Sequence, residues 1–283
     1  FNNDWELTSG FHAFLFDLHT DPEGNFIFAF GSPVRGGGRS FERMSAHHGS
    51  VLKVSKDGST LSRYASGLRA PNGIGVSPTG QITTGDNEGT FVPRCPINWV
   101  TEDDFLGVVD SYENRDLLKT TATVEDRRIG RDTHLEPSEE PKPLAWLPKG
   151  VDNSGGGQGW VTSDKWGPFE GEMLHGSYGQ SSLYLVLKER IGTQMQGGVV
   201  KFPMRPTSSV MRLRFNERDG QLYISGLKGW QSNAGRNGGF DRLRFTGKPV
   251  AMPKGLNVTS KGLRLSFTQP LDPETANDAS SFS

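Results

Sequence analysis

The chain has 283 residues and a formal net charge of -1, with 37 glycines, 17 prolines and a hydrophobic fraction of 33%. Many turn-forming residues with few apolar ones are typical of short strands joined by turns and argue against a helical bundle. We expect no nucleic-acid partner, because no basic stripe is present, and no membrane span, because no apolar run is long enough. The single Cys95 cannot form an internal disulfide and does not indicate a compartment.

One pattern repeats along the chain: an alternating strand, a turn that contains glycine, and a second strand. It is regular at 11–30, 73–84 and 211–225, and less regular from residue 151. Propellers are built from blades of four strands around a channel. We therefore predict an all-β fold, a β-propeller, with about four blades at roughly 11–68, 70–147, 150–206 and 211–252. A sandwich or a solenoid is the alternative fold.

Two segments do not follow the repeat. Residues 112–142 are charged and aperiodic, which indicates a long excursion within the second blade. The tail, 253–283, is similar to the opening of an immunoglobulin-like module, which needs around seven strands. We therefore expect a propeller domain at 1–252 and a truncated immunoglobulin-like segment at 253–283.

Polar residues at the start of each inner strand should converge on the propeller channel. His12 opens the first inner strand, and its imidazole titrates near neutrality, so it is a candidate general base. A structural histidine is the simpler alternative. Arg69 opens the second inner strand, and Arg212 and Arg214 lie on the fourth.

A set of oxygen-bearing side chains also falls at these positions, and it suits a hard cation such as calcium. The candidate calcium ligands are Asn72, Asp86, Asp152 and Asn153. The alternative is that they serve as turn residues, because Asn and Asp favour turns through local hydrogen bonds.

The segments 11–31, 50–58, 67–73 and 211–223 resemble the glucose/sorbosone dehydrogenase family of quinoprotein propellers, and the chain is similar to the dehydrogenase-like propellers of planctomycetes. The resemblance implies a six-bladed propeller that binds pyrroloquinoline quinone (PQQ) and calcium and oxidises sugars, in the periplasm or outside the cell. It implies that His12 is the base, that Arg69 contacts the quinone, and that Arg212 and Arg214 face its carboxylates.

The sequence departs from that family where the cofactor binds. Ala70 stands in place of a cofactor-binding Asn, Gly179 or Gln180 in place of a lysine, and Ser32 in the region of a Gln. Losing a charged partner of a tricarboxylate should cost several kcal/mol of binding. These departures put the quinone site in doubt.

A weaker resemblance, carried by Pro71-Asn72-Gly73, the turn 77–80 and Asp86, is to gluconolactonase and paraoxonase propellers. It implies a channel calcium ion that polarises a lactone or ester carbonyl while a base activates water. We therefore favour a calcium-dependent hydrolase with His12 as the general base.

Two alternatives stay open, a PQQ-dependent sugar dehydrogenase and a non-catalytic binding propeller. The partner expected in either enzyme is a small-molecule substrate. A propeller without its full set of blades leaves sheet edges exposed, so we also expect a homodimer.

Overall fold

The computed structural model describes residues 1–5, 7, 10, 12–36, 38, 41–42, 44–89, 92–108, 142–278 and 280. Most of the predicted excursion at 112–142 therefore lies outside the described residues. In the described part of the chain, no helix is long and apolar enough to cross a membrane.

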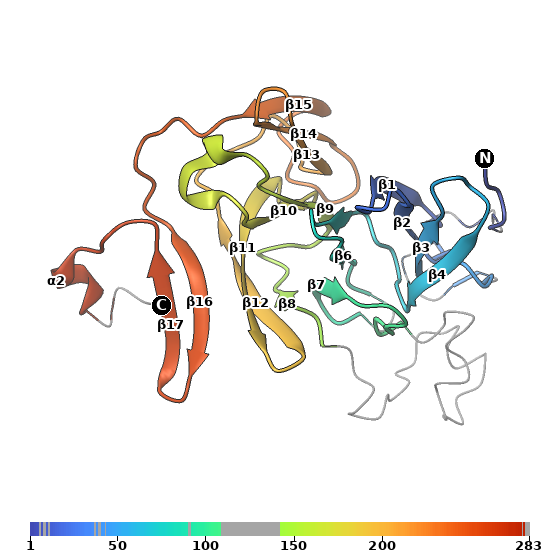
Figure 1. The fold of residues 1–283 in the computed structure, drawn as a ribbon, viewed down its shortest axis with the longest axis horizontal. Coiled ribbons are helices and arrows are strands. Elements are labelled where there is room, and N and C mark those ends of the chain that lie inside the picture. The colour runs from blue at the N-terminus through green and yellow to red at the C-terminus, as the bar shows by residue number, and fades with distance from the viewer. Residues whose placement is uncertain are drawn as a thin grey trace.

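Four antiparallel sheets follow one another along the chain (Figure 1). The first contains β1 (Leu15–Thr20), β2 (Phe26–Phe30), β3 (Ser50–Val54) and β4 (Leu61–Ser66). The second contains β5 (Ile74–Val76), β6 (Ile82–Gly85), β7 (Cys95–Val100) and β8 (Ala145–Leu147). The third contains β9 (Gly155–Trp160), β10 (Met173–Ser177), β11 (Ser182–Ile191) and β12 (Gln194–Lys201). The fourth contains β13 (Arg212–Asn216), β14 (Gln221–Leu227) and β15 (Gly238–Leu243).

The strands of each sheet pair in chain order, so each sheet is a meander that begins at its inner strand. The predicted turns between the first two strands form as expected. In the β1–β2 turn, the amide of Gly24 donates to the carbonyl of Asp21, and Gly24 adopts a positive φ of 88°. Gly80 and Ser77 repeat this geometry in the β5–β6 turn. Local turn chemistry of this kind fixes the hairpins.

Each pair of neighbouring sheets shares its own apolar cluster. Ile27 and Ile74 belong to the cluster between the first two sheets. Ile97 and Met173 belong to the cluster between the second and third sheets, and Leu213 belongs to that between the third and fourth. The inner strands are direct neighbours as well, because β1 contacts β5, β5 contacts β9, and β9 contacts β13. The four sheets therefore pack face to face around the inner strands.

A two-stranded hairpin of β16 (Pro253–Thr259) and β17 (Gly262–Phe267) follows, on the side of the third sheet away from the N-terminal sheet (Figure 1). Met252 and Leu256 pack against the cluster between the third and fourth sheets. The amide of Val258 donates to Glu189 Oε2 at 2.9 Å. A 3-10 helix (η2, Asp164–Phe169) and a short helix (α2, Pro273–Ala276) complete the described elements. The domain boundary at 252 and the immunoglobulin-like character of the tail stay predictions.

Candidate functional site

A cavity of about 480 Å³ lies at one end of the inner strands. Its walls come from two kinds of segment: those that enter the inner strands β1, β5, β9 and β13, and those that leave the second strands β6, β10 and β14. All four sheets therefore contribute to one cavity. Of the predicted site residues, His12, Arg69, Asn72 and Asn153 line it.

His12 precedes β1 and lines the cavity with Phe14 and Phe16. Its Nδ1 lies 3.3 Å from the carbonyl oxygen of Val34. Because a carbonyl can only accept a hydrogen bond, this contact places the imidazole proton on Nδ1. Nε2 is then the nitrogen that carries the basic lone pair.

Aromatic rings form much of the cavity wall. Phe14 and Phe16 stack with their ring centroids 4.7 Å apart, and Trp230 meets Phe14 edge-on at 6.2 Å. Tyr178 in turn lies 6.3 Å from Trp230. The Trp230 side chain is 66% exposed, and its backbone has a positive φ of 41°. Exposed indole and phenyl faces at a cavity are suited to contact the apolar face of a flat ligand.

Asp86 holds the loop that carries Arg69 in place. Its carboxylate accepts the backbone amides of Arg69 and Ala70 at 2.7 Å each, and that of Asn87 at 2.8 Å. Burial raises the pKa of Asp86 to about 6, although these amide donors act in the opposite direction. Both carboxylate oxygens are thus engaged within the protein. These bonds give Asp86 a structural role, and its calcium ligation stays a prediction.

Asn72 and Asn153, two of the three asparagines that line the cavity, are fixed by contacts with other segments. Asn72 Nδ2 donates to the carbonyl of Gly155 at 2.9 Å. Asn153 Oδ1 accepts from Gln180 Nε2 at 2.9 Å. Arg212 Nη1 also donates to Asn72 Oδ1 at 3.4 Å, and Asn153 Nδ2 donates to the carbonyl of Gln231 at 3.4 Å. Both sides of each amide are therefore held by the protein.

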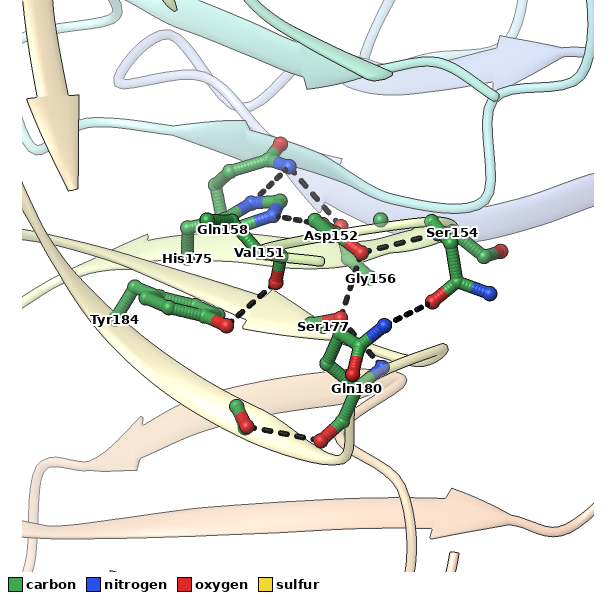
Figure 2. A network of polar contacts seen from close by, with 12 residues as sticks. Val151, Asp152, Ser154, Gly156, Gln158, His175, Ser177, Gln180 and Tyr184 are labelled. Atoms are coloured by element: carbon green, nitrogen blue, oxygen red, sulfur yellow. Dashed lines mark hydrogen bonds and ion pairs between the residues drawn. The ribbon is translucent and has the colours of Figure 1, made fainter. Parts of the chain in front are cut away.

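Asp152 does not face the cavity but lies within a buried polar network (Figure 2). His175 Nε2 lies 2.7 Å from its Oδ2, and Ser177 Oγ donates to its Oδ1 at 2.6 Å. Gln158 Nε2 lies 3.2 Å from His175 Nδ1. Asp152 sits between the serine and the histidine, so the three residues do not form a nucleophilic triad, in which the histidine would contact the serine.

Of the four predicted calcium ligands, Asn72 and Asn153 line the cavity, whereas Asp86 and Asp152 do not. Across the described ranges, no group of three or more His, Cys, Asp or Glu side chains could hold a metal ion. The amide oxygens of Asn72 and Asn153 lie at the cavity without a carboxylate from Asp86 or Asp152 beside them.

Arg212 and Arg214 do not line the cavity, in contrast to the expectation that they face a cofactor there. Both guanidinium groups contact the carboxylate of Asp17 in β1, which is 1% exposed. Burial opposes ionisation of Asp17, but the contact with His19 and the charges of Arg214 and Arg212 outweigh it and lower its pKa. These arginines are therefore already paired with an internal anion.

No protein-family model matches the chain, and no curated protein matches it. Solved structures do match. The soluble aldose sugar dehydrogenase of Escherichia coli, in its apo form, shares 13% identity with a TM-score of 0.53, over 79% of this chain and 61% of that chain. The PQQ-bound aldose sugar dehydrogenase of Streptomyces coelicolor shares 13% identity with a TM-score of 0.53, over 80% and 60%.

The chain is a β-propeller. At this identity the likeness shows the fold alone, and this propeller spans about three fifths of the length of the solved structures named above. A gluconolactonase of Xanthomonas campestris is similar with a TM-score of only 0.38, so that likeness carries no argument.

Sequence reasoning missed Asp17, and it favoured core packing over ligand contact for Trp230, which is 66% exposed. Asp17 alternates with Phe16 and Leu18, which is the pattern of an ordinary solvent-facing strand residue. Trp230 lies outside the strand repeat, and only its large aromatic ring could have marked it as a ligand contact. Both become visible once strands from the first and fourth sheets are placed together.

Proposed function

We propose that the propeller binds a sugar or a related uncharged polyol in the cavity, and that it is the substrate-binding part of a sugar dehydrogenase. In this proposal His12 is the base that takes a proton from a substrate hydroxyl. This is the alternative that the sequence left open, and it replaces the calcium-dependent hydrolase as the favoured hypothesis.

The composition of the cavity carries the proposal. Four aromatic rings and several side-chain amides surround a volume of about 480 Å³, which lies in the range of small-molecule sites. Aromatic faces contact the C–H face of a sugar ring, and amides exchange hydrogen bonds with its hydroxyls. The lining includes Arg69 and Glu88, whose opposite charges suit a ligand without net charge.

Oxidation is better supported than lactone hydrolysis for two reasons. The solved structures with a TM-score above 0.5 include proteins named as glucose and aldose sugar dehydrogenases, whereas the gluconolactonase likeness falls below that value. In addition, calcium prefers carboxylate ligands, and neither of the predicted carboxylates, Asp86 and Asp152, lines the cavity.

PQQ, which is named for the aldose sugar dehydrogenase of Streptomyces coelicolor, would meet these lining residues if it entered the cavity. Its planar rings suit the aromatic walls, but it carries three carboxylates. Among the described residues, Arg69 is the one Arg or Lys side chain that lines the cavity, and Glu88 opposes its charge. The residues present do not fit a tricarboxylate, so the proposal covers substrate binding and proton removal at His12. The hydride that leaves the sugar carbon as the carbonyl forms would pass to an electron acceptor that does not carry three carboxylates.

His12 is suited to this role because its Nδ1 proton is held by the Val34 carbonyl. Such a contact fixes the ring orientation and the tautomer, as a second partner does for other catalytic histidines. Nε2 would accept the hydroxyl proton, and Arg69 or an asparagine amide would hold a neighbouring oxygen of the substrate.

The experiment is calorimetric titration of the metal-stripped protein with glucose and with gluconolactone, followed by turnover assays. Sugar oxidation would be followed by reduction of an artificial electron acceptor, with and without added PQQ, and lactone opening by acid release. We expect glucose to bind, and we expect His12→Ala to lower sugar turnover by about 100-fold or more with a much smaller effect on binding.

His47→Ala is the matched control, because His47 does not line the cavity. Equal turnover in wild type and His12→Ala would contradict the role of His12. Lactone opening without sugar oxidation would support the calcium-dependent hydrolase hypothesis instead. Sugar binding without any turnover would support the hypothesis of a non-catalytic binding propeller.

A further inference from the structure

Asp17 occupies an unusual position at the centre of the inner strands. The pairing of β1 with β2 shifts register between Phe16 and Leu18, so Asp17 is the extra residue of a β-bulge. Its backbone has a positive φ of 66°, a conformation that Asp and Asn tolerate better than most residues. The bulge turns the side chain inward, where it is 1% exposed. Bulges that re-aim a side chain in this way are common beside functional sites.

The carboxylate of Asp17, on β1, contacts the inner strands β5 and β13 and lies close to β9. Arg214 Nη2 of β13 donates to its Oδ1, and Arg212 Nε, also of β13, lies 3.7 Å from the same oxygen. The amide of Ile74 in β5 lies 3.4 Å from its Oδ2. A Cβ atom added to Gly157 in β9 would lie 3.0 Å from Oδ2. Asp17 therefore stands where the first and fourth sheets meet across the inner strands.

The arginines held by Asp17 are close to the candidate site. The guanidinium of Arg212 lies over the ring of Phe16, 5.3 Å from its centroid, and its Nη1 is 3.4 Å from Asn72 Oδ1. Phe16 and Asn72 both line the cavity. Arg212 thus lies directly behind the cavity wall, one side chain away from a bound ligand.

This arrangement satisfies the charge of the arginines internally. Two guanidiniums and His19 surround one buried carboxylate. Charge-assisted bonds of this kind are the ones that a carboxylate ligand would otherwise make. A polyanion entering the cavity would meet Arg69 but would have to displace Asp17 to reach the arginine pair.

We propose that Asp17 is a specificity residue that excludes polyanionic ligands, because it occupies the arginine pair in place of a ligand carboxylate. Replacing Asp17 by Asn then converts Arg212 and Arg214 into an anion-binding site. The choice of an uncharged polyol as the preferred ligand rests on the proposed function, but the exclusion of polyanions is tested separately from it.

The experiment is calorimetric titration of wild type, Asp17→Asn and Asp21→Asn with PQQ, citrate and glucose. Asparagine keeps the shape of the aspartate side chain and suits the positive φ, so the Asp17→Asn variant is expected to fold, as checked by circular dichroism and thermal unfolding. Asp21→Asn is the matched control, because Asp21 is also a buried carboxylate of the first sheet but pairs with Lys53.

We expect Asp17→Asn to bind PQQ and citrate at least tenfold more tightly than wild type, with glucose affinity changed less than threefold. The control should match wild type for all three ligands. Micromolar or tighter binding of PQQ by wild type overturns the proposal, as does a folded Asp17→Asn variant with no gain.

A second variant keeps the test open if Asp17→Asn does not fold. Arg212→Gln should leave the weak citrate binding of an otherwise wild-type protein unchanged, because the guanidinium is already paired. A tenfold loss overturns the proposal. Failure of glucose to bind any variant would refute the proposed function and leave the polyanion result standing on its own.

Discussion

At the scale of single residues, two buried carboxyls respond to burial in opposite ways. Asp17 meets His19 and two arginines, which keep its pKa lowered in spite of burial. Burial raises the pKa of Asp86 to about 6, although backbone amides and the charge of Arg69 act to lower it. The two pKa values shift in opposite directions because Asp17 contacts charged groups, whereas Asp86 contacts mainly the dipoles of backbone amides. The Asp17 contribution to stability is present above its unfolded pKa and is lost as pH falls through the folded pKa.

The raised pKa of Asp86 leads to a prediction of how the free energy of unfolding depends on pH. The unfolded carboxyl releases its proton near pH 3.8 and the folded one near 6, so the contribution of Asp86 is fully present below 3.8 and lost as pH rises to 6. The loss is at most about 3 kcal/mol. Urea unfolding of wild type between pH 4 and 7 should show this decline in the free energy of unfolding.

The comparison variant for this prediction is Asp86→Asn, which cannot ionise. We expect it to be less stable than wild type, since an amide cannot accept all the backbone amides, and to show a flatter pH profile between 4 and 6. Asp164→Asn, at an exposed position, should keep the wild-type slope. An unchanged slope in Asp86→Asn would assign the pH dependence to other groups.

At the scale of elements, close contact between inner strands depends on glycine. A Cβ atom added at Gly73, just before β5, would lie 2.1 Å from the carbonyl oxygen of Gly156 in β9. Contacts this short do not occur, so the second and third sheets could not approach as they do with a side chain there. The Gly155–Gly157 run opens the inner strand β9 beside this contact.

Gly73→Ala should consequently destabilise the propeller, by about 2 kcal/mol or more, since the clash is with backbone and not with a flexible side chain. Thermal and urea unfolding measure the effect. Gly150→Ala is the control, because a Cβ atom at Gly150 would meet nothing within 4 Å. Equal stability of the two variants would show that the strands can separate at little cost.

At the scale of the whole molecule, the fourth sheet differs from the other three. Its outer strand in the described residues is β15, where Phe240 is 72% exposed and stacks on Tyr223. An outer strand presents unpaired backbone donors and acceptors that can pair with another chain. The homodimer expected from the sequence would form most readily at this edge.

Light scattering over a range of protein concentrations tests the dimer. We expect a dimer in wild type and a shift to monomer in Phe240→Lys, because a charge at the edge opposes strand pairing. Ile191→Lys, at an exposed position of the third sheet, should leave the association unchanged. A monomer at all concentrations would contradict the prediction.

The candidate site was predictable in part. The entry segments of the inner strands were expected to converge, and His12, Arg69, Asn72 and Asn153 do line one cavity. The expected calcium ligands were harder to judge, because a carboxylate at a turn can point either toward a channel or back onto backbone amides. Asp86 does the latter, and nothing in its neighbouring sequence distinguishes the two cases.

The sequence by itself determined the four sheets and their hairpins, since alternation and turn chemistry act over a few residues, as in the hydrogen bond from Gly24 to Asp21. Only the tertiary structure decided which charges meet. Arg214 and Asp17 are 197 residues apart in the chain. Their pairing depends on a bulge in β1 and on the approach of the first sheet to the fourth. Long-range contacts of this kind arise from packing, and packing decides which ligand charge the cavity can accept.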